Sequence, residues 1–198
     1  MTAAAQDSWR FGPVRVQALA HTPGLRGEPQ VRDLLASWLE HGAGTLPLAR
    51  DTHGRPHLLA PFQDRDASWS HSGERLLLAL GREVAVGVDL ERLRPRPRAL
   101  ELARRFFAPA EADWLEALAP ALREPEFIRL WCAKEAVLKA HGRGLAFGLH
   151  RLELGADDPG APLHLRRADP ELGDRQAWQL REWQPQDGYH AAVAWRPR

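Results

Sequence analysis

Two carboxylates end an apolar segment at residues 85–92, which reads AVGVDLER. Because side chains alternate between the faces of a strand, Asp89 and Glu91 share one face with Ala85 and Gly87, and the bulkier residues share the other. Two carboxylates this close repel each other, so we expect a positive group between them. Mg²⁺ suits such a pair of oxygen donors when a substrate phosphate completes its coordination. The alternative is a strand that emerges into water with both acids solvated beside basic residues.

A second group of ionisable residues, Lys134, Glu135 and Lys139, lies in a predicted helix over residues 125–142. At about 100° per residue, Lys134 falls in the middle of the apolar face of this helix and Glu135 at its edge. A charge buried without a partner is destabilising, and ionisable groups in such positions are candidates for a functional site. Two structural explanations stay open: a surface ion pair between Glu135 and Lys139, and a Lys134 side chain that extends to the helix flank.

Polar residues upstream of these segments could bind phosphate. His71 lies between Ser70 and Ser72 at the entrance of a strand, and Arg55 lies in a Gly-Arg-Pro turn. A guanidinium in such a turn can hold a phosphate with two hydrogen bonds. His71 could equally be a turn residue with its own hydrogen bonds.

Hydrophobic periodicity and turn residues predict the elements that must position these groups. We expect a helix from residue 31 that Gly42 ends, an antiparallel hairpin of strands 75–80 and 82–91, a linker over 92–100, helices over 109–118 and 125–142, and strands over 162–167, 177–183 and 189–195. The segments SGERLLLAL and DGYHAAVAW both place a glycine turn before a small apolar strand, in comparable positions of the two halves. This similarity suggests an internal duplication.

The composition is that of an ordinary globular protein, with 44% hydrophobic and 27% charged residues over 198 positions. This length allows one large domain or two small ones. The net charge of +1 gives no general attraction to nucleic acid or membrane, so electrostatic recognition must come from local patches. The single cysteine, Cys132, fits a reducing cytoplasm, and we find no signal peptide or membrane span in the sequence.

Five motifs in order along the chain resemble those of the 4′-phosphopantetheinyl transferases of the surfactin-synthetase type. They are GRP (54–56), SHS (70–72), GVDLE (87–91), RRFFAPAE (104–111) and WCAKEAVLKAHGRG (131–144). Each motif is weak alone, but GVDLE followed about forty residues later by WCAKEAVLK is specific. The resemblance covers the chain from about residue 32 to 148.

The resemblance implies an α+β (α/β) fold, a pseudo-dimer of two similar halves. Each half would be a small, mainly antiparallel sheet packed with helices, with coenzyme A (CoA) in the cleft between residues 1–95 and 96–198. Members of this family transfer the 4′-phosphopantetheine group of CoA to a serine of an apo acyl or peptidyl carrier protein and release adenosine 3′,5′-bisphosphate. We therefore expect a cytoplasmic, monomeric enzyme whose partners are CoA and a carrier protein, with no nucleic acid or membrane.

The same resemblance assigns roles to individual residues. Asp89, Glu91 and Glu135 would ligate Mg²⁺, with Mn²⁺ as the alternative, and Glu135 would also take the proton from the carrier serine. Lys139 would stabilise the pyrophosphate and assist departure of the nucleotide. Lys134 would contact the pyrophosphate with an ammonium that points into the cleft. The expected CoA contacts are Arg32, Arg55, Ser70, His71, Asp89, Lys134 and Lys139.

Some features depart from the family pattern. The family usually has lysine where Arg55 stands, and the N-terminal basic cluster is reduced to Arg26 and Arg32. The first twenty residues match nothing in the family. Carrier recognition could involve the arginines of residues 92–98 together with apolar side chains of the following helices, although those side chains could equally be core. These apolar side chains are Phe106, Phe107 and Trp114.

Two other functions fit parts of the sequence. A CoA-binding protein without catalytic activity would keep the cleft, but it would be free to lose the charged residues named above. A nuclease that uses two carboxylates and Mg²⁺ would need a basic groove, which the near-neutral composition does not favour.

Overall fold

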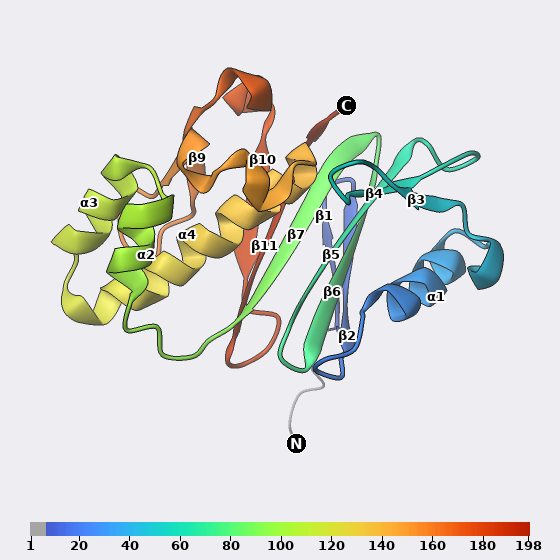
Figure 1. Cartoon of the computed structure of the whole chain (residues 1–198), viewed down its shortest axis with the longest axis horizontal. Helices are drawn as coiled ribbons and strands as arrows, with labels where there is room; N and C mark the ends of the chain where they lie inside the picture. The colour runs from blue at the N-terminus through green and yellow to red at the C-terminus, as the bar shows by residue number, and fades with distance from the viewer. Residues whose placement is uncertain (1–6) are drawn as a thin grey trace.

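The computed structural model describes residues 7–198, and the molecule has two lobes that meet along a pair of strands (Figure 1). The helices α2, α3 and α4 lie in one lobe, and α1 lies in the other. Strands β5, β6 and β7 run between them (Figure 1). Helices and antiparallel sheets make an α+β fold, as predicted. Of the first twenty residues, which match nothing in the family, residues 1–6 lie outside the described part of the chain.

The first sheet has the strand order β1-β2-β6-β5 and is antiparallel throughout. Its strands are β1 (Ser8–Phe11), β2 (Val14–Ala20), β5 (Arg65–Ser72) and β6 (Arg75–Arg82). Helix α1 (Glu28–Trp38) covers one face, where Val31 and Leu35 pack against Leu76 and Leu78. The helix that we expected from residue 31 is therefore present, and it begins three residues earlier, at Glu28.

The second sheet has the order β10-β11-β7. It consists of β7 (Val84–Arg92), β10 (Gln179–Trp183) and β11 (Tyr189–Pro197). The predicted hairpin between residues 75–80 and 82–91 is wrong, because β6 bonds to β2 and β5 on its two edges while β7 bonds to β11. Between them Glu83 adopts a left-handed conformation (φ 58°), and the chain passes into the other sheet.

The alternation of β7 explains this packing. Its bulky face, formed by Val84, Val86, Val88 and Leu90, is buried together with Val14, Val16, Leu77 and Ala79 of the first sheet. Both faces of β6 are therefore buried. The predicted boundary at residues 95 and 96 would count β7 with the N-terminal half, whereas its backbone ladder is with β11, a strand of the C-terminal half. The division into two halves, and their similarity, stay predictions.

The helices of the second lobe are α2 (Ala99–Phe106), α3 (Pro109–Ala117) and α4 (Pro120–His141). Helix α3 agrees with the predicted 109–118, and α4 begins five residues earlier than predicted. Helix α2 was missed because Pro95 and Pro97 led us to extend the linker as far as residue 100. The remaining short strands are β3 (Leu48–Arg50), β4 (Pro56–Leu58), β8 (Leu152–Gly155) and β9 (His164–Ala168). The 3₁₀ turns are Ala43–Thr45, Gly144–Phe147, Leu149–Arg151, Pro170–Leu172 and Arg175–Ala177.

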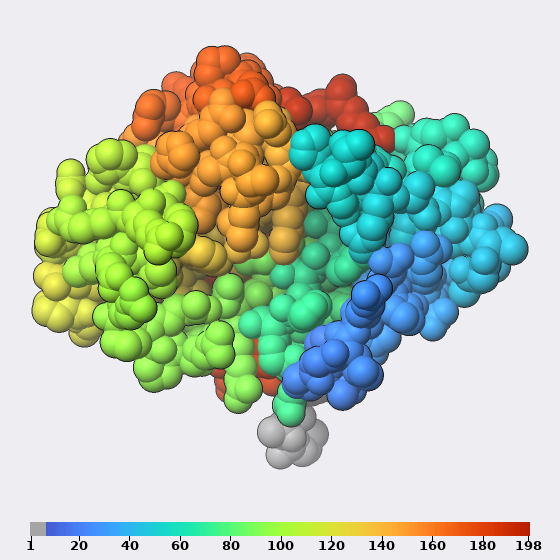
Figure 2. All heavy atoms as spheres, in the orientation of Figure 1, coloured from blue at the N-terminus to red at the C-terminus, as the bar shows by residue number. Residues whose placement is uncertain are grey.

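Helix α4 lies directly on the small face of β7. A Cβ atom placed on Gly87 would stand 2.0 Å from the carbonyl oxygen of Ala136 and 2.4 Å from the amide of Ala140. Only glycine permits this approach, since any side chain would collide with helix backbone. In the space-filling view, the segment near residue 50 lies against the segment that follows α4, so the two lobes also touch above β7 (Figure 2).

Candidate active site

The two edge strands β5 and β7 are joined by side chains rather than by a backbone ladder. Asp66 and Ser68 of β5 accept hydrogen bonds from the amides of Val86 (2.7 Å) and Val88 (3.1 Å), and Ser72 accepts one from the amide of Arg92 (3.0 Å). Because residues two apart share a face of a strand, the alternation in DASWSHS places one polar side chain after another along this seam. These short polar side chains accept hydrogen bonds from amides at the edge of β7 that would otherwise have no partner.

Ser70 is the next polar residue of this row, and its hydroxyl contacts the charged residues of the site. The Nζ atom of Lys139 lies 2.6 Å from Oδ1 of Asp89, 2.9 Å from Oγ of Ser70 and 3.2 Å from the carbonyl oxygen of Val88. The Ser70 hydroxyl also donates to Oδ1 of Asp89 at 2.7 Å. Burial acts to lower the pKa of Lys139, but the carboxylates of Asp89 and Glu135 outweigh it and raise that pKa. Lys139 is therefore the positive group next to Asp89.

The other two acids are Glu135 and Glu91. Oε2 of Glu135 is 4.0 Å from Nζ of Lys139, and burial together with the charge of Asp89 raises the pKa of Glu135 to about 7. Burial and Asp89 also raise the pKa of Glu91, whose carboxylate accepts a hydrogen bond from Arg96 at 2.6 Å. Each of these carboxylates would be stabilised by additional positive charge.

The structure allows a test of whether these residues suit a divalent cation. Asp89 is 3% exposed, and within residues 7–198 its Oδ2 atom has no hydrogen-bond partner. A buried carboxylate oxygen without a partner, next to two acids of raised pKa, is a donor set that fits a hard cation. In the present side-chain arrangement, no three His, Cys, Asp or Glu residues of the described chain are placed to hold one ion. The assignment of three ligands therefore stays a prediction.

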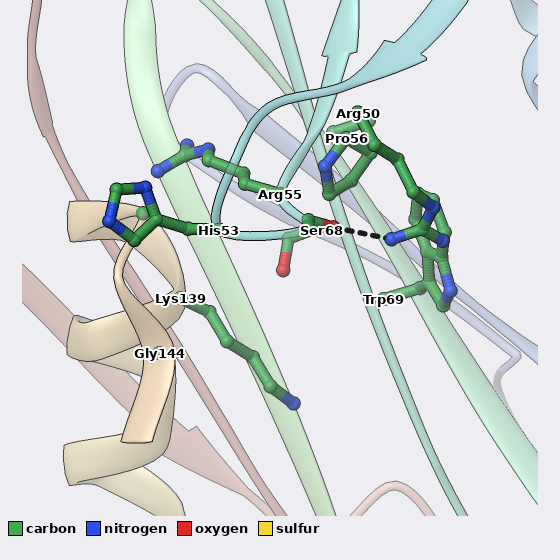
Figure 3. A pocket seen from close by; sticks show the side chains of 11 residues that line it. Arg50, His53, Arg55, Pro56, Ser68, Trp69, Lys139 and Gly144 are labelled. Atoms are coloured by element: carbon green, nitrogen blue, oxygen red, sulfur yellow. Dashed lines mark hydrogen bonds between the residues drawn. The ribbon is translucent and has the colours of Figure 1, made fainter. Parts of the chain in front are cut away.

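A pocket of about 220 Å³ opens beside Lys139, between the β3–β4 turn, β5 and the end of α4 (Figure 3). Three basic side chains line it: Arg50, Arg55 and Lys139. The guanidinium of Arg50 lies over the ring of Trp69, 5.3 Å from its centroid. Arg50 also donates to the carbonyl of Gly54 (2.5 Å) and to Glu28 (2.6 Å). Positive charge, an aromatic ring and exposed backbone are the groups that bind a nucleotide phosphate and base.

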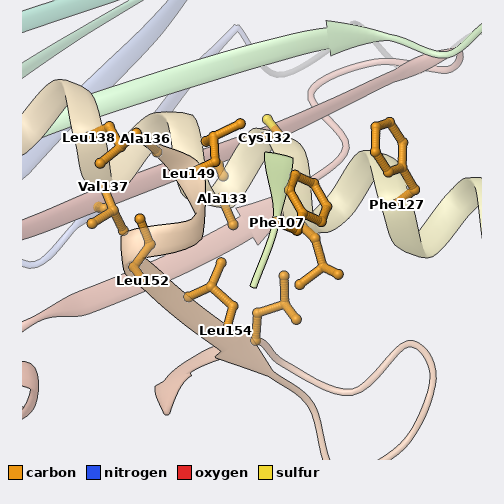
Figure 4. Close-up of a cluster of buried hydrophobic side chains, with 14 of the residues drawn as sticks. Phe107, Phe127, Cys132, Ala133, Ala136, Val137, Leu138, Leu149, Leu152 and Leu154 are labelled. Carbon is orange, nitrogen blue, oxygen red and sulfur yellow. The ribbon is translucent and has the colours of Figure 1, made fainter. Parts of the chain in front are cut away.

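Lys134 is not in this cleft, and its predicted position is wrong. Its side chain is fully buried and donates to the carbonyl oxygens of Leu149 (2.8 Å) and Leu152 (2.6 Å), while Glu111 forms an ion pair with it at 2.7 Å. Figure 4 shows Leu149, Leu152 and Phe107 beside α4, around which this core is built. Burial lowers the pKa of Lys134 and raises that of Glu111, and their ion pair opposes both shifts.

The other predicted CoA contacts lie in different surroundings. Arg55 lines the pocket, but its guanidinium also donates to Asp66 and to the carbonyl of Ala140 at the end of α4, which joins the lobes. Arg32 donates to Glu28, Leu46 and Leu48 at the base of the β3–β4 hairpin. His71 is exposed and follows Ser70 on β5. Whether any of these residues contacts CoA stays a prediction.

Sequence reasoning missed several residues of this region. Arg50, His53 and Trp69 line the pocket, and Arg96 pairs with Glu91. Trp69 lies inside the SWSHS segment, where the alternation of polar residues places it opposite the serines, so this signal was available. Arg50 and Arg96 carried no signal, because nothing local in the sequence fixes the partner of a surface arginine.

Comparison with known proteins shows which family this chain resembles. The family model of the 4′-phosphopantetheinyl transferase superfamily matches residues 85–194, which include β7 and α4. A Synechocystis protein, slr0495, named provisionally as a 4′-phosphopantetheinyl transferase, is 37% identical over 175 residues, covering 83% of this chain and 68% of that protein. The 4′-phosphopantetheinyl transferase HetI of Nostoc is 34% identical over 179 residues (87% and 72%). The transferase Sfp of Bacillus subtilis is 28% identical over 125 residues (63% and 54%).

The chain therefore belongs to the 4′-phosphopantetheinyl transferase superfamily, and the predicted family and enzyme class are confirmed. The general reaction of this class is transfer of the 4′-phosphopantetheinyl group. In the described residues, none of the helices combines the length and the apolar character needed to cross a bilayer.

Proposed function

We propose that this enzyme transfers the 4′-phosphopantetheine group of CoA to a serine of an apo acyl or peptidyl carrier protein. The observation that carries the proposal is the cluster of Lys139, Asp89 and Glu135 at the edge of a basic pocket between the lobes. CoA would place its nucleotide in this pocket and its pyrophosphate next to Lys139. The proposed enzyme is a monomer that acts in the cytoplasm.

The reaction forms a bond between the serine oxygen and the β-phosphorus of CoA and breaks the pyrophosphate bond, so that adenosine 3′,5′-bisphosphate leaves. Glu135 accepts the serine proton, and burial together with Asp89 makes its carboxyl group more basic than an ordinary glutamate in the absence of metal, with a pKa of about 7. The ammonium of Lys139, close to Asp89, is available to neutralise the leaving phosphate. Asp89, Glu91 and Glu135 would hold Mg²⁺, or Mn²⁺ as the alternative, which supplies positive charge to the phosphates when bound.

Carrier proteins present an acidic surface, and the exposed arginines of residues 92–98 would meet it beside the site. Phe107 cannot take part, because it is buried in the core of the second lobe. Phe106 and Trp114 are partly buried against the same core, so only the exposed part of each side chain is available for docking.

Incubation with CoA, Mg²⁺ and an apo carrier protein tests the proposal by the mass of the carrier. We expect the mass of one phosphopantetheine group to be added, and we expect no addition with Glu135→Ala or with excess EDTA. CoA binding without transfer by the wild-type enzyme, across a panel of carriers, would indicate a binding protein instead. Cleavage of nucleic acid under the same conditions would indicate a nuclease.

A further inference from the structure

His21 is a buried histidine that the proposed mechanism does not use. It follows β2, and its amide donates to the carbonyl of Glu74 at 2.8 Å. His21 is only 5% exposed, and neither of its ring nitrogens has a hydrogen-bond partner within residues 7–198. Buried polar groups in folded proteins are nearly always paired, so this ring calls for an explanation. A leucine or phenylalanine would fill the same space without an unpaired nitrogen.

The ring of His21 packs face to face on the ring of His71. The two centroids are 4.5 Å apart, with an angle of 28° between the planes. His71 is the exposed member of the pair, and the residue before it, Ser70, bonds to both Lys139 and Asp89. Burial lowers the pKa of His71, and the nearby His21 and Lys139 lower it further. His71 projects from the opposite face of β5 to Ser70, and it lies close enough to Lys139 for that charge to act on its ring.

We propose that His21 is a positioning residue, whose buried ring holds the imidazole of His71 in place to contact the phosphates of CoA. This inference rests on the proposed function. An exposed histidine on a strand is free to change rotamer, and binding must then order it. A buried ring stacked beneath it removes much of that freedom before CoA arrives. A Cβ atom built on Gly27 would stand 3.9 Å from Cδ2 of His71, so the loop before α1 lies next to this ring.

The test measures CoA affinity by isothermal titration calorimetry, in Mg²⁺, for wild type, His21→Ala, His21→Phe, His71→Ala and the double variant His21→Ala/His71→Ala. We expect His21→Ala to weaken CoA binding about 3- to 10-fold, the effect of ordering one side chain. The flat ring of His21→Phe should restore most of the affinity. Because His21 acts through His71, the double variant should bind CoA no more weakly than His71→Ala.

Steady-state transfer kinetics and thermal unfolding separate this role from a purely structural one. A positioning role raises KM for CoA in His21→Ala while kcat stays close to wild type. His41→Ala is the matched control: His41 also packs against an aromatic ring of the same lobe (Phe62, 5.5 Å), and we expect its affinity for CoA to be unchanged.

Three results would overturn the inference: a lower melting temperature of His21→Ala with unaltered CoA affinity, losses that add in the double variant, or no loss in His71→Ala. Failure of the proposed function gives a different result, because wild type would then leave the carrier unmodified.

Discussion

Replacement of Glu135 by glutamine should stabilise the metal-free protein at alkaline pH while it abolishes transfer. The pKa of Glu135 is raised from 4.5 to about 7 by burial and by Asp89, so its folded form holds a proton more tightly than the unfolded chain does. The folded state therefore binds more protons than the unfolded state between these two values, and stability falls as pH rises through this window. Above pH 7 the whole penalty of the ionised carboxylate is present. Glutamine has a similar shape and no charge.

The size of the pKa shift of Glu135 gives the expected change in the free energy of unfolding. One pKa unit corresponds to about 1.4 kcal/mol, so a shift from 4.5 to about 7 corresponds to a penalty of about 3 kcal/mol at pH 8. Glu135→Gln should raise the free energy of unfolding by about this amount at pH 8, and by little at pH 4.5 and below. Urea titrations in EDTA, at pH 4.5 and pH 8, measure both values. Saturation with Mg²⁺ should reduce or reverse the gain, because the ionised acid then has a partner.

Glu74→Gln serves as the control, since Glu74 is an exposed glutamate of the turn between β5 and β6. It should show no comparable dependence on pH. A Glu135→Gln protein that is less stable than wild type at pH 8 would refute the reasoning, because it would mean that the carboxylate is already well paired in the absence of metal.

Three further substitutions test other parts of the structure. Gly87→Val should destabilise the fold by about 3 kcal/mol or prevent folding, since its side chain would meet the backbone of α4, and thermal unfolding would detect this. Glu111→Gln should cost about 3–5 kcal/mol in urea titrations, because it removes the negative charge that pairs with the buried ammonium of Lys134. Lys139→Met should abolish carrier modification in the mass assay and lower the melting temperature in EDTA, because Asp89 then loses its counter-ion.

Periodicity alone predicted much of the site. The alternation over 84–91 placed Asp89 on the small face of β7, and that face is where α4 lies. For Lys134, the helical periodicity indicated the middle of the apolar face, and the structure agrees. The family resemblance then moved its ammonium to the cleft, and this step was wrong. The physical reason is that Glu111 and two carbonyl groups already satisfy the charge inside the core.

The pairing of strands was beyond local reasoning. Residues 75–82 and 84–92 are neighbours in sequence and look like a hairpin, but pairing depends on which edges are free and which faces must be buried. Strand β6 has both edges occupied, by β2 and β5, and β7 turns its valines toward the first sheet. These are properties of the assembled sheets, and no window of a few residues contains them.

The joint between β5 and β7 connects the position of Lys139 and Asp89 to the packing of the two lobes. Val88 uses its amide to bond Ser68 and its carbonyl to bond Lys139, so one residue of β7 ties a β5 side chain to the ammonium next to Asp89. A backbone ladder would have used that edge for strand pairing and left no room for Ser70 to reach the site. Because side chains make the joint instead, the residue types of β5 determine where Lys139 stands. The polar alternation of this strand is therefore as much a part of the site as the acids.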